Sequence, residues 1–492
     1  MKKTLSLLLV LLMMLSTLVA CKGNKEDEKN PGSVSTSGGT SSGDDLSREN
    51  AVSSLPSDLN FGGTQITIYS RNREDISFEL VGDGSSSEAL SSAVYYRNLE
   101  VETKLGVKLN VQLGPGGYTE ASQFMSNVRN NAMASDDDKF DIVSGAKYSL
   151  VPLSLEGLFS NLLSLDYIDT EKPWWNTSFI DECTYKGKLY TIEGELALSM
   201  IDGAFVMFFN KEEFNNIHKG VDLYEIVNNG DWTFARFKEL IKDTWGDDGN
   251  GEPDNADFFG LVSPSFACGR DGFPTSFGAT VTQTDANGEI TLNFDTDRNK
   301  TIWLDFYEFL NSESSVFVNG ANDGARTECT NMFEKGKALF ITELLHYSWS
   351  LPSTGVDYGV IPLPKYDENQ ESYRTNSESM HSQFSITSYG PRTEAAAATL
   401  ELLCFQTYKS VTMTYYEKTM KGKNMNDEQS IMMLDLVVDS ITCNFGEQFA
   451  SEITWPFPVI GTENNIASYF EGKTQILNFK LPKLLSTLES LD

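Results

Sequence analysis

The stretch YKGKLYTIEGELALSMIDGAFVMFFNK, from Tyr185 to Lys211, decides how the rest of the chain is organised. It begins with a short basic turn and ends in Ala-Phe-Val-Met-Phe-Phe, an apolar and aromatic-rich run of strand length. Such a run predicts a buried strand. Because a strand this apolar needs cover on both faces, we expect a mostly parallel sheet with helices on either side of it.

Length and composition place the chain among large globular proteins. Its 492 residues exceed what one core usually organises, so two or three domains are expected. The net charge of −32 comes from 70 acidic side chains against 38 Lys and Arg. With no basic surplus to displace counterions, nucleic acid and anionic lipid are not expected as direct partners. The simplest interpretation of the acidity is solubility at a cell surface.

The first residues have the features of an export signal. Lys2 and Lys3 precede an apolar run, Leu5 to Leu15, that is too short to span a membrane. The segment ends in Leu-Val-Ala-Cys21, which resembles the lipobox of bacterial lipoproteins. That resemblance implies cleavage before Cys21, lipidation of its sulfur and anchoring at the outer face of the cell membrane. The alternative is an ordinary signal peptide with a chance cysteine. Residues 22–57 are polar and rich in Gly and Ser, so they are predicted to be a flexible tether.

The remaining cysteines give little sign of a disulfide framework. Five follow Cys21, an odd number, and no CxxC pair is present. Buried free thiols are the simpler interpretation. A disulfide between Cys268 and Cys329 is the alternative, and it rests only on their proximity in the sequence.

The folded part begins with a regular alternation of elements. Thr64–Ser70 and Val107–Leu113 alternate like strands, and Phe140–Ser144 is a shorter strand. Helical patterns lie between them, over 89–105 and 118–133. Strand, helix, strand, helix, strand is typical of a parallel α/β sheet, in which ligands collect at the carboxyl ends of the strands. That rule nominates Ser70, Arg71 and the segment from Ser144 to Tyr148.

Several segments, in order, resemble one known family. They are GLFSNLLSLDYIDTEKPWW (157–175), YKGKLYTIEGELALS (185–199), FFNKEEF (208–214), YEIVNNGDWT (224–233), MFEKGKALF (332–340) and DYGVIPLPK (357–365). Together they are similar to the extracellular solute-binding proteins of family 1, the lipoprotein receptors of carbohydrate ABC importers. The resemblance covers roughly Thr64 to the C-terminus. It implies a type II periplasmic-binding-protein-like fold, in which two α/β lobes close on a ligand by a hinge motion.

The connectivity of that family predicts where the lobes divide. Lobe one would comprise residues 58–204 and 357–416, and lobe two residues 205–356 and 417–492. Phe205–Asn210 would then make the first crossing between the lobes. The Ala-rich helix predicted over 393–408 would pack in lobe one, and the helix over 427–440 in lobe two.

The motifs of common enzymes are missing from the part of the sequence expected to fold. There is no HExxH or GxGxxG, and the GxSxG match at 39–43 lies in the Gly- and Ser-rich tether, where no strand-to-helix elbow is expected. The three histidines have no spacing typical of a metal site or a triad. Glu193 and Glu195 could face one side of a strand at the separation of a glycosidase pair. Binding of sugar hydroxyls and a solvated acidic edge are the alternatives. We therefore expect a protein that is not an enzyme.

A sugar site needs flat aromatic faces and planar polar groups. The candidates from the expected lobe one, beside Ser70, Arg71 and Glu195, are Tyr148, Trp174, Trp175 and Asp202. Those from the expected lobe two are Phe273, Tyr347 and Trp349, and Trp455 lies in a Trp-Pro-Phe-Pro loop near the C-terminus. For each tryptophan the alternative is packing in the core, most clearly for Trp174 and Trp175.

An acidic, glycine-rich stretch from Gly246 to Asp257 resembles a degenerate calcium loop. With Gly251 at the sharp turn of an EF-hand loop, acidic and amide side chains occupy or flank the ligand positions: Asp248, Asn250, Glu252, Asp254 and Asp257. The first ligand position is then Gly246, and the last is Asp rather than the longer Glu. An acidic turn that binds no metal is the alternative, and no cofactor is required.

The expected function follows from the resemblance. The chain would be a monomeric, lipid-anchored, extracytoplasmic substrate-binding protein that delivers a carbohydrate, an oligosaccharide by preference, to an ABC permease. A surface carbohydrate-active enzyme and a receptor for a non-sugar solute such as a peptide are the alternatives.

Overall fold

The computed structural model describes residues 48, 50–135, 137–265, 267–320, 322–419, 428–454 and 464–491. All of them belong to one compact unit, Gly43–Asp492. The predicted signal segment, Cys21, most of the predicted tether and Trp455 lie outside the described residues. The end of the predicted tether is held by the folded part, since Arg48 Nη1 donates to Glu195 at 2.7 Å and Ser54 Oγ to Glu401 at 2.7 Å. Ordered structure thus begins before Ser57, where the tether was expected to end.

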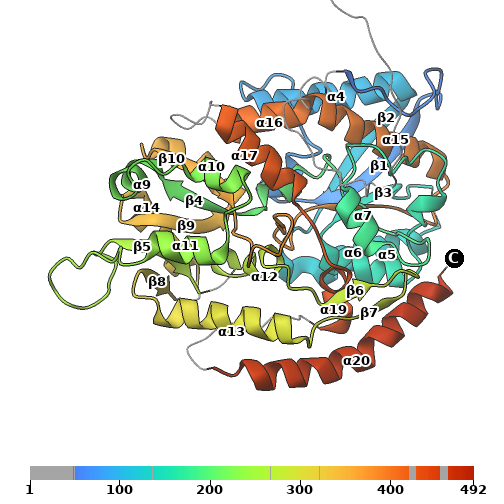
Figure 1. The fold of residues 1–492 in the computed structure, drawn as a ribbon. Helices are drawn as coiled ribbons and strands as arrows, with labels where there is room; N and C mark the ends of the chain where they lie inside the picture. The colour runs from blue at the N-terminus through green and yellow to red at the C-terminus, as the bar shows by residue number, and fades with distance from the viewer. Residues whose placement is uncertain are drawn as a thin grey trace, which may run out of the picture. The chain divides into compact units, whose positions relative to one another are not determined.

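A four-stranded sheet, here called the β1 sheet, is built from the first half of the chain and one later strand. Its order is β11 (Gln383–Ile386), β3 (Ile142–Gly145), β1 (Thr64–Arg71) and β2 (Val107–Gly114). β1 runs parallel to β2 and β3, and β11 runs antiparallel to β3. The helices α4 (Ala89–Leu105) and α15 (Thr393–Gln406) pack against each other and against this sheet (Figure 1).

Local sequence signals explain the elements of this sheet. Helix α4 ends where Gly106 adopts a left-handed conformation, with φ of +58°, that favours glycine. A Cβ atom at Gly106 would also overlap the side chain of Asn60. The predicted strands and helices between residues 64 and 145 are confirmed within two residues, apart from a short turn of 3-10 helix (η1, Tyr118–Glu120) that opens α5 (Ala121–Met133).

A five-stranded sheet, here called the β4 sheet, contains the apolar run that ends the stretch Tyr185–Lys211. Its order is β10 (Tyr358–Pro362), β4 (Phe205–Asn210), β9 (Ala338–Leu344), β5 (Phe259–Pro264) and β8 (Val316–Asn319). All six residues of β4 are buried, which confirms the predicted cover on both faces. However, β4 runs antiparallel to both neighbours, whereas β5 runs parallel to both of its own. Apolar sequence reports burial but not the direction of the neighbouring strands.

Three segments of chain run side by side where the two sheets are joined. Ala204, directly before β4, forms a β-bridge with Ser377, and Glu378 N donates to Gly203 O at 2.8 Å. Thr375 forms a second bridge with Ile441. The segment 440–443 leads from α17 (Glu428–Asp439), which packs on β10, to α18 (Phe445–Gln448), which packs on α7 (Thr177–Cys183). We call 203–204, 375–378 and 440–443 the crossing segments.

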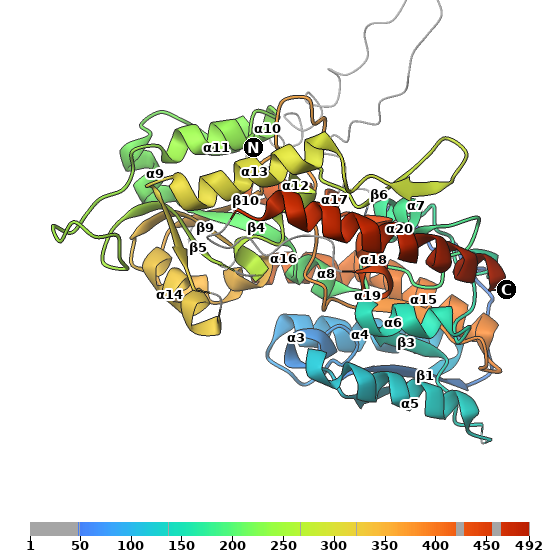
Figure 2. The ribbon, with the colours of Figure 1, turned by 90° about the horizontal axis from the view of Figure 1, so that it is seen from below.

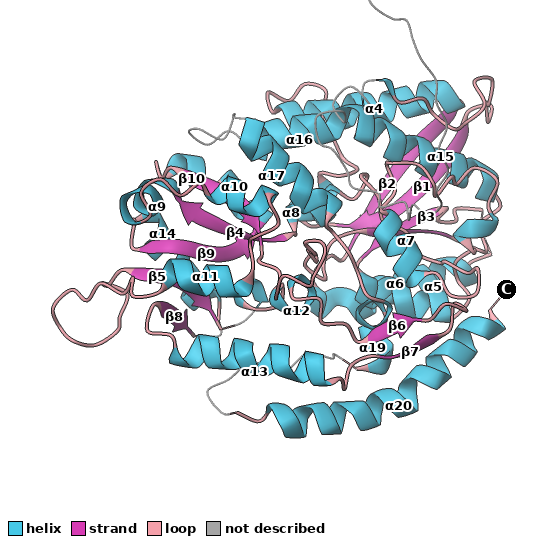
Figure 3. Ribbon diagram, viewed as in Figure 1, coloured by secondary structure: helices cyan, strands magenta, loops and turns pink. Residues whose placement is uncertain are grey.

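The remaining elements surround these sheets (Figures 2 and 3). They are α3 (Glu74–Ser77), α6 (Lys147–Leu155), η2 (Leu162–Ser164), α8 (Leu198–Asp202), α9 (Lys211–Ile217), α10 (Leu223–Asn228), α11 (Phe234–Ile241), η3 (Ala267–Gly269), α12 (Phe273–Ser276), β6 (Thr282–Thr284), β7 (Ile290–Leu292), α13 (Asp297–Ser312), α14 (Asp323–Glu334), η4 (Leu345–Trp349), η5 (Leu351–Ser353), the π-helical turn η6 (Thr407–Val411), α16 (Thr412–Thr419), α19 (Ala450–Ile453) and α20 (Ile466–Ser490). α20 lies along α13 and α19. Within the described part of the chain, no helix is long and apolar enough to cross a membrane.

The α/β fold class predicted from the sequence is confirmed. The lobe boundaries stay a prediction, because elements late in the chain contact both halves. For example, α19 packs on α6, which follows β3 of the β1 sheet, whereas α17 packs on β10 of the β4 sheet. The five cysteines after Cys21 are all buried and unbridged, which agrees with the interpretation as buried thiols. Cys268 Sγ donates to Glu343 Oε1 at 3.4 Å and forms no bond with Cys329.

Candidate functional site

The carboxyl ends of β1 and β3 lie at one edge of the β1 sheet, where ligands of α/β proteins usually bind. β1 ends at Ser70 and Arg71, and β3 ends at Ser144 and Gly145, just before α6 begins. Both serines are fully buried. Neither serine Oγ atom has a hydrogen-bond partner among the described residues. This edge therefore offers polar atoms that the surrounding protein leaves unsatisfied.

Arg71 joins β1 to the segment that leads into β11. Its Nη1 atom donates to Met380 O at 2.6 Å, and its Nη2 atom donates to Ser382 Oγ at 3.1 Å. The side chain is buried, and this burial lowers the pKa of Arg71. The nearby Glu79 carboxylate opposes this shift, because its negative charge raises the pKa of Arg71. Nε of Arg71 has no partner among the described residues, so one donor stays available.

Two tyrosines meet beside this edge. Tyr148, at the start of α6, and Tyr118, in η1, have ring centroids 5.1 Å apart in an edge-to-face arrangement. Burial raises the pKa of Tyr148, and the Arg71 guanidinium opposes that rise, which places the hydroxyl near Arg71. Tyr118 is 68% exposed. An exposed aromatic ring next to a half-buried one provides a flat apolar surface for a ligand.

A bidentate ion pair lies at the rim of the same edge. Arg73 binds Asp75, in α3, through two hydrogen bonds, and the Nε–Oδ1 distance is 2.9 Å. The hydrogen bond to Asp75 raises the pKa of Arg73. For Asp75, burial would raise the pKa, but Arg73 outweighs it and the pKa is lowered. Both groups are therefore charged near neutral pH. The pair is partly exposed and could exchange hydrogen bonds with sugar hydroxyls.

The β4 sheet contributes a third aromatic ring. Trp349 ends η4, directly after β9, and is half-buried. Its ring lies 5.8 Å from Phe78, which follows α3, and 4.6 Å from His346. Lys418 Nζ lies 3.5 Å from the centre of the Trp349 ring. Trp349 thus contacts residues that flank both sheets.

Asp202 connects the surroundings of Trp349 to the first crossing segment. It ends α8, just before Gly203, and its Oδ2 atom lies 2.6 Å from His346 Nδ1. Its Oδ1 atom accepts a hydrogen bond from Tyr415 Oη at 2.7 Å. The hydrogen bond to Asp202 raises the pKa of His346, and partial burial opposes the rise. Because both of its carboxylate oxygens are hydrogen-bonded, Asp202 positions His346 and Tyr415 in this conformation.

We call these residues the inter-sheet cluster. They share a position between the carboxyl end of β1 and the carboxyl end of β9: Ser70, Arg71, Arg73, Asp75, Phe78, Tyr118, Tyr148, Asp202, His346 and Trp349. The cluster combines flat aromatic faces with planar guanidinium and carboxylate groups. That combination suits a ligand with apolar C–H faces and paired hydroxyl groups.

Trp175 and Glu195 have other roles in this structure. Trp175 is 4% exposed, and its Nε1 atom donates to Glu401 of α15 at 2.9 Å, so its ring is part of the core, like that of Trp174. Glu195 is buried between Arg48 and Thr412. Glu193 is also buried and binds His381 and Gln383. The alternative of a solvated acidic edge is therefore wrong, and the two carboxylates bind different partners instead of forming a pair.

Phe273 and Tyr347 are also buried and packed against other residues of the core. Phe273 is 1% exposed, and its ring centre lies 4.5 Å from that of Phe306. Tyr347 is 9% exposed and donates to Glu334 at 2.9 Å. In this conformation neither ring offers a face to a ligand. Trp455 lies outside the described residues, so its predicted role stays a prediction.

The predicted calcium loop is part of a long irregular segment between α11 and β5 (Figure 3). Asp257 organises it, accepting hydrogen bonds from Trp245 Nε1 at 3.0 Å and from Asp248 N at 2.8 Å. The hydrogen bond from Trp245 lowers the pKa of Asp257. Asp248 and Asp257 lie near Asp247, with carboxylate oxygens within 4.8 Å of one another.

The other predicted calcium ligands do not join that group of three. Asn250 Nδ2 donates to Asp254 Oδ2 at 2.8 Å, and Glu252 is exposed. The structure therefore brings together two of the five residues expected and adds Asp247. Binding of calcium stays a prediction.

Two hollows elsewhere are poor candidates for a sugar site. One, lined by Cys183, Gln448 and neighbours, has a volume of about 10 Å³, which is room for a single water molecule. The other, formed by residues 54–56 and 166–171, measures about 500 Å³ and is open to solvent. It is lined by three carboxylates and one aromatic ring, Tyr167, and no strand ends at it.

Tyr118, Arg73, Asp75, Phe78 and His346 were not predicted as site residues. All five follow the carboxyl end of a strand: Arg73, Asp75 and Phe78 follow that of β1, and Tyr118 follows that of β2. His346 could have been found from its position just after β9.

Comparison with known proteins supports the fold. No protein-family model and no curated protein matches the chain. A solved cyclo/maltodextrin-binding protein complexed with maltotetraose matches with a TM-score of 0.53 and 12% identity, over 87% of this chain and 97% of that one. An extracellular solute-binding protein from Staphylococcus aureus in complex with maltose matches with a TM-score of 0.56 and 13% identity, over 86% of this chain and all of the other. The chain therefore has the two-lobed fold of periplasmic-binding-protein-like solute-binding proteins.

Proposed function

We propose that this protein is the substrate-binding protein of an ABC importer and captures a carbohydrate between its two lobes. The observation that carries the proposal is the inter-sheet cluster, which combines the rings of Tyr118, Tyr148 and Trp349 with the Arg73–Asp75 pair near the carboxyl ends of β1, β2 and β9. Aromatic faces and planar charged groups are the chemistry that binds sugar rings. The likeness in fold to proteins bound to maltose and maltotetraose supports the same ligand class.

The proposed mechanism is closure of the two lobes about the crossing segments. A ligand that contacts side chains from both sheets stabilises the closed form by its differential affinity for that form. The crossing segments are hydrogen-bonded to one another, so they could bend together. An oligosaccharide is proposed because the cluster spans residues from both sheets.

The remaining parts of the proposal concern location and partners. The lipobox-like Leu-Val-Ala-Cys21 supports a lipid anchor at the outer face of the cell membrane, and the acidic chain supports a soluble body beyond it. The partner that receives the sugar would be an ABC permease, and the receptor would act as a monomer. The acidic loop around Asp257 is proposed as a calcium site that stabilises the loop, separate from the sugar site.

A thermal-shift screen tests the proposed ligand class. The chain starting at Lys22 would be heated with a panel of mono- and oligosaccharides, with peptides as controls. A ligand at a hundredfold its Kd should raise the free energy of unfolding by about 2.7 kcal/mol. A shift with one sugar series, and no turnover of that sugar, supports a carbohydrate receptor. Turnover would favour the carbohydrate-active enzyme, and a response to peptides alone would favour a peptide receptor.

A further inference from the structure

Two cysteine side chains meet at the third crossing segment. Cys183 is the last residue of α7, and Cys443 stands two positions before α18 begins. They are 5% and 8% exposed, respectively. In the sequence they stand 260 positions apart, so nothing in the local sequence pairs them.

Hydrogen bonds on both sides hold the two cysteine-bearing segments together. Ser178 Oγ donates to Thr442 Oγ1 at 2.7 Å, and Asn444 Nδ2 donates to Glu182 Oε2 at 3.4 Å. The neighbours of Cys443 are thus bonded to α7 itself. Helices α7 and α18 also pack against each other.

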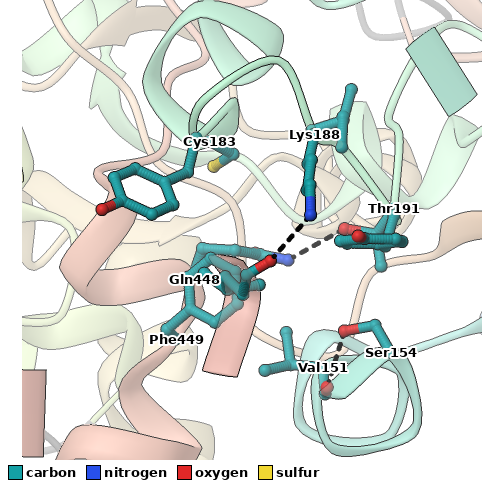
Figure 4. A pocket seen from close by; sticks show the side chains of 11 residues that line it. Val151, Ser154, Cys183, Lys188, Thr191, Gln448 and Phe449 are labelled. Carbon is teal, nitrogen blue, oxygen red and sulfur yellow. Dashed lines mark hydrogen bonds between the residues drawn. The ribbon is translucent and has the colours of Figure 1, made fainter. Parts of the chain in front are cut away.

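The two thiols also lie near each other and near Gln448. Cys443 Sγ lies 3.9 Å from Gln448 Oε1, and Gln448 and Cys183 line the same cavity (Figure 4). Burial raises the pKa of Cys183 well above its ordinary value, and interaction with the Cys443 thiol raises it further. Each thiol is therefore the other's neighbour in a site closed to solvent.

The other cysteines are arranged differently. Cys268 Sγ donates to Glu343 Oε1 at 3.4 Å, and Cys404 Sγ donates to Trp174 O at 3.0 Å. Cys329 lies in α14, beside the β4 sheet. Cys329 has only a small raising effect on the pKa of Cys268, and the Cys268 thiol is hydrogen-bonded to Glu343 rather than to Cys329.

We propose that Cys183 and Cys443 form a disulfide bond when the chain folds in an oxidising compartment. One thiolate would attack a small-molecule or protein disulfide and release one thiol, and the second cysteine would then displace the other. The Sγ–Sγ bond forms, and the attacked disulfide is reduced to two thiols. Because both sulfurs are buried in the folded protein, the exchange would take place during folding.

The bond would fasten the segment 440–443 to α7. Ile441 in that segment is bridged to Thr375, and Ser377 is bridged in turn to Ala204. A covalent link at Cys443 would therefore restrain the group of crossing segments about which the lobes are proposed to move. The oxidising location and this consequence for lobe motion rest on the proposed function; the bond itself can be tested without them.

The test is a map of the linkage in protein refolded with oxidised and reduced glutathione. The chain starting at Lys22 has five cysteines. We expect three thiols to react in denaturant after oxidative refolding, all five after reduction, and a non-reducing peptide digest to contain the Cys183–Cys443 pair. Five reactive thiols after oxidative refolding, or a bond between other cysteines, would overturn the proposal.

Cysteine variants test whether the Cys183–Cys443 disulfide stabilises the protein. Reduction should lower the unfolding temperature of the parent chain by several degrees and leave that of Cys183→Ser unchanged, because closing a long loop restricts the unfolded chain. Cys329→Ser is the matched control, since it removes a buried thiol outside the pair and should keep the response to reduction. An equal response in Cys183→Ser and in the parent would contradict the assignment. Sugar binding is not used as a readout, so failure of the carbohydrate proposal leaves this test intact.

Discussion

Glu401 shows how much one buried carboxylate can organise. It lies in α15 and accepts hydrogen bonds from Trp174 Nε1 at 3.0 Å and Trp175 Nε1 at 2.9 Å. Ser54 Oγ donates to it as well, at 2.7 Å. Burial raises the pKa of Glu401, and these hydrogen bonds oppose the rise. The Pro-Trp-Trp motif is thereby fixed in the core, and the start of the ordered chain is tied to the same carboxylate.

Removing that acceptor should destabilise the protein. We expect Glu401→Ala to lower the free energy of unfolding by about 2–4 kcal/mol, because two buried indole N–H groups lose their partner. Urea denaturation measures the change. Glu394→Ala, in the same helix but exposed, is the control and should change stability by no more than about 0.5 kcal/mol. A loss equal to that of the control would contradict the role given to Glu401.

The Asp202–His346 contact should make stability depend on pH. Because the folded pKa of His346 is raised, its stabilising contribution is fully present below the unfolded pKa of about 6.5 and is lost as pH rises through the folded value. The stability difference between the parent and His346→Gln should therefore be larger at pH 5.5 than at pH 9. It should stay below about 1 kcal/mol, since the side chain is 46% exposed. Denaturation at the two pH values measures it, and equal differences would contradict it.

The site residues show what sequence can and cannot tell at this scale. Arg71, Tyr148, Asp202 and Trp349 were predicted and do lie together. Trp175 was predicted to bind a ligand, but its indole N–H donates to Glu401, which lies 226 positions away in the chain. Residue type tells which groups a side chain can bind. Residue type does not tell which side chain from a distant part of the sequence the fold will place against it.

At the scale of elements, local sequence signals were sufficient to predict where helices and strands begin and end. They did not predict which strands pair or in which direction. Periodicity and Gly106 predicted α4 to the residue, and alternation predicted β1 and β2 within one residue. A mostly parallel sheet was expected around β4, but both strands beside β4 run antiparallel to it. β9 and β10 come from positions more than 120 residues beyond β4, and their register depends on tertiary packing.

One glycine allows β10 to pair with β4. Gly359 lies opposite Phe209, and a Cβ atom there would overlap the Phe209 ring and the Tyr224 hydroxyl. We expect Gly359→Ala to lower the free energy of unfolding by about 1–3 kcal/mol through overpacking. The control is Gly472→Ala in α20, where the added Cβ meets no atom within 4 Å and should be neutral or stabilising. Denaturant midpoints compare the two, and a fully stable Gly359→Ala protein would contradict the packing described.

At the scale of the whole molecule, the fold class could be predicted because the family-like segments lie in order along the chain. The division into lobes could not be checked from any one segment, since α17, α18 and α19 contact different halves in turn. The inter-sheet cluster was found only in part, because its members come from loops after strands that are far apart in the sequence.

The proposed anchor makes a prediction for the intact protein in cells. We expect Cys21→Ala to move the protein from the membrane fraction to the medium or to block its processing, because the sulfur that would carry the lipid is missing. Fractionation followed by immunoblotting measures the distribution. Cys329→Ser, far along the chain, is the control and should stay with the membrane. An unchanged distribution of Cys21→Ala would contradict the anchor.

The most direct measurement is calorimetric titration of the chain starting at Lys22 with the sugar that stabilises it. The comparison includes Tyr118→Ala, from the side of the β1 sheet, and Trp349→Ala, from the side of the β4 sheet. Tyr96→Ala is the control, since Tyr96 is 59% exposed on α4 and outside the cluster. We predict one site with a micromolar or tighter Kd, weakened about tenfold or more by each cluster variant and unchanged by the control. Sugar binding that survives both cluster variants, or no binding of any sugar, would contradict capture between the two lobes.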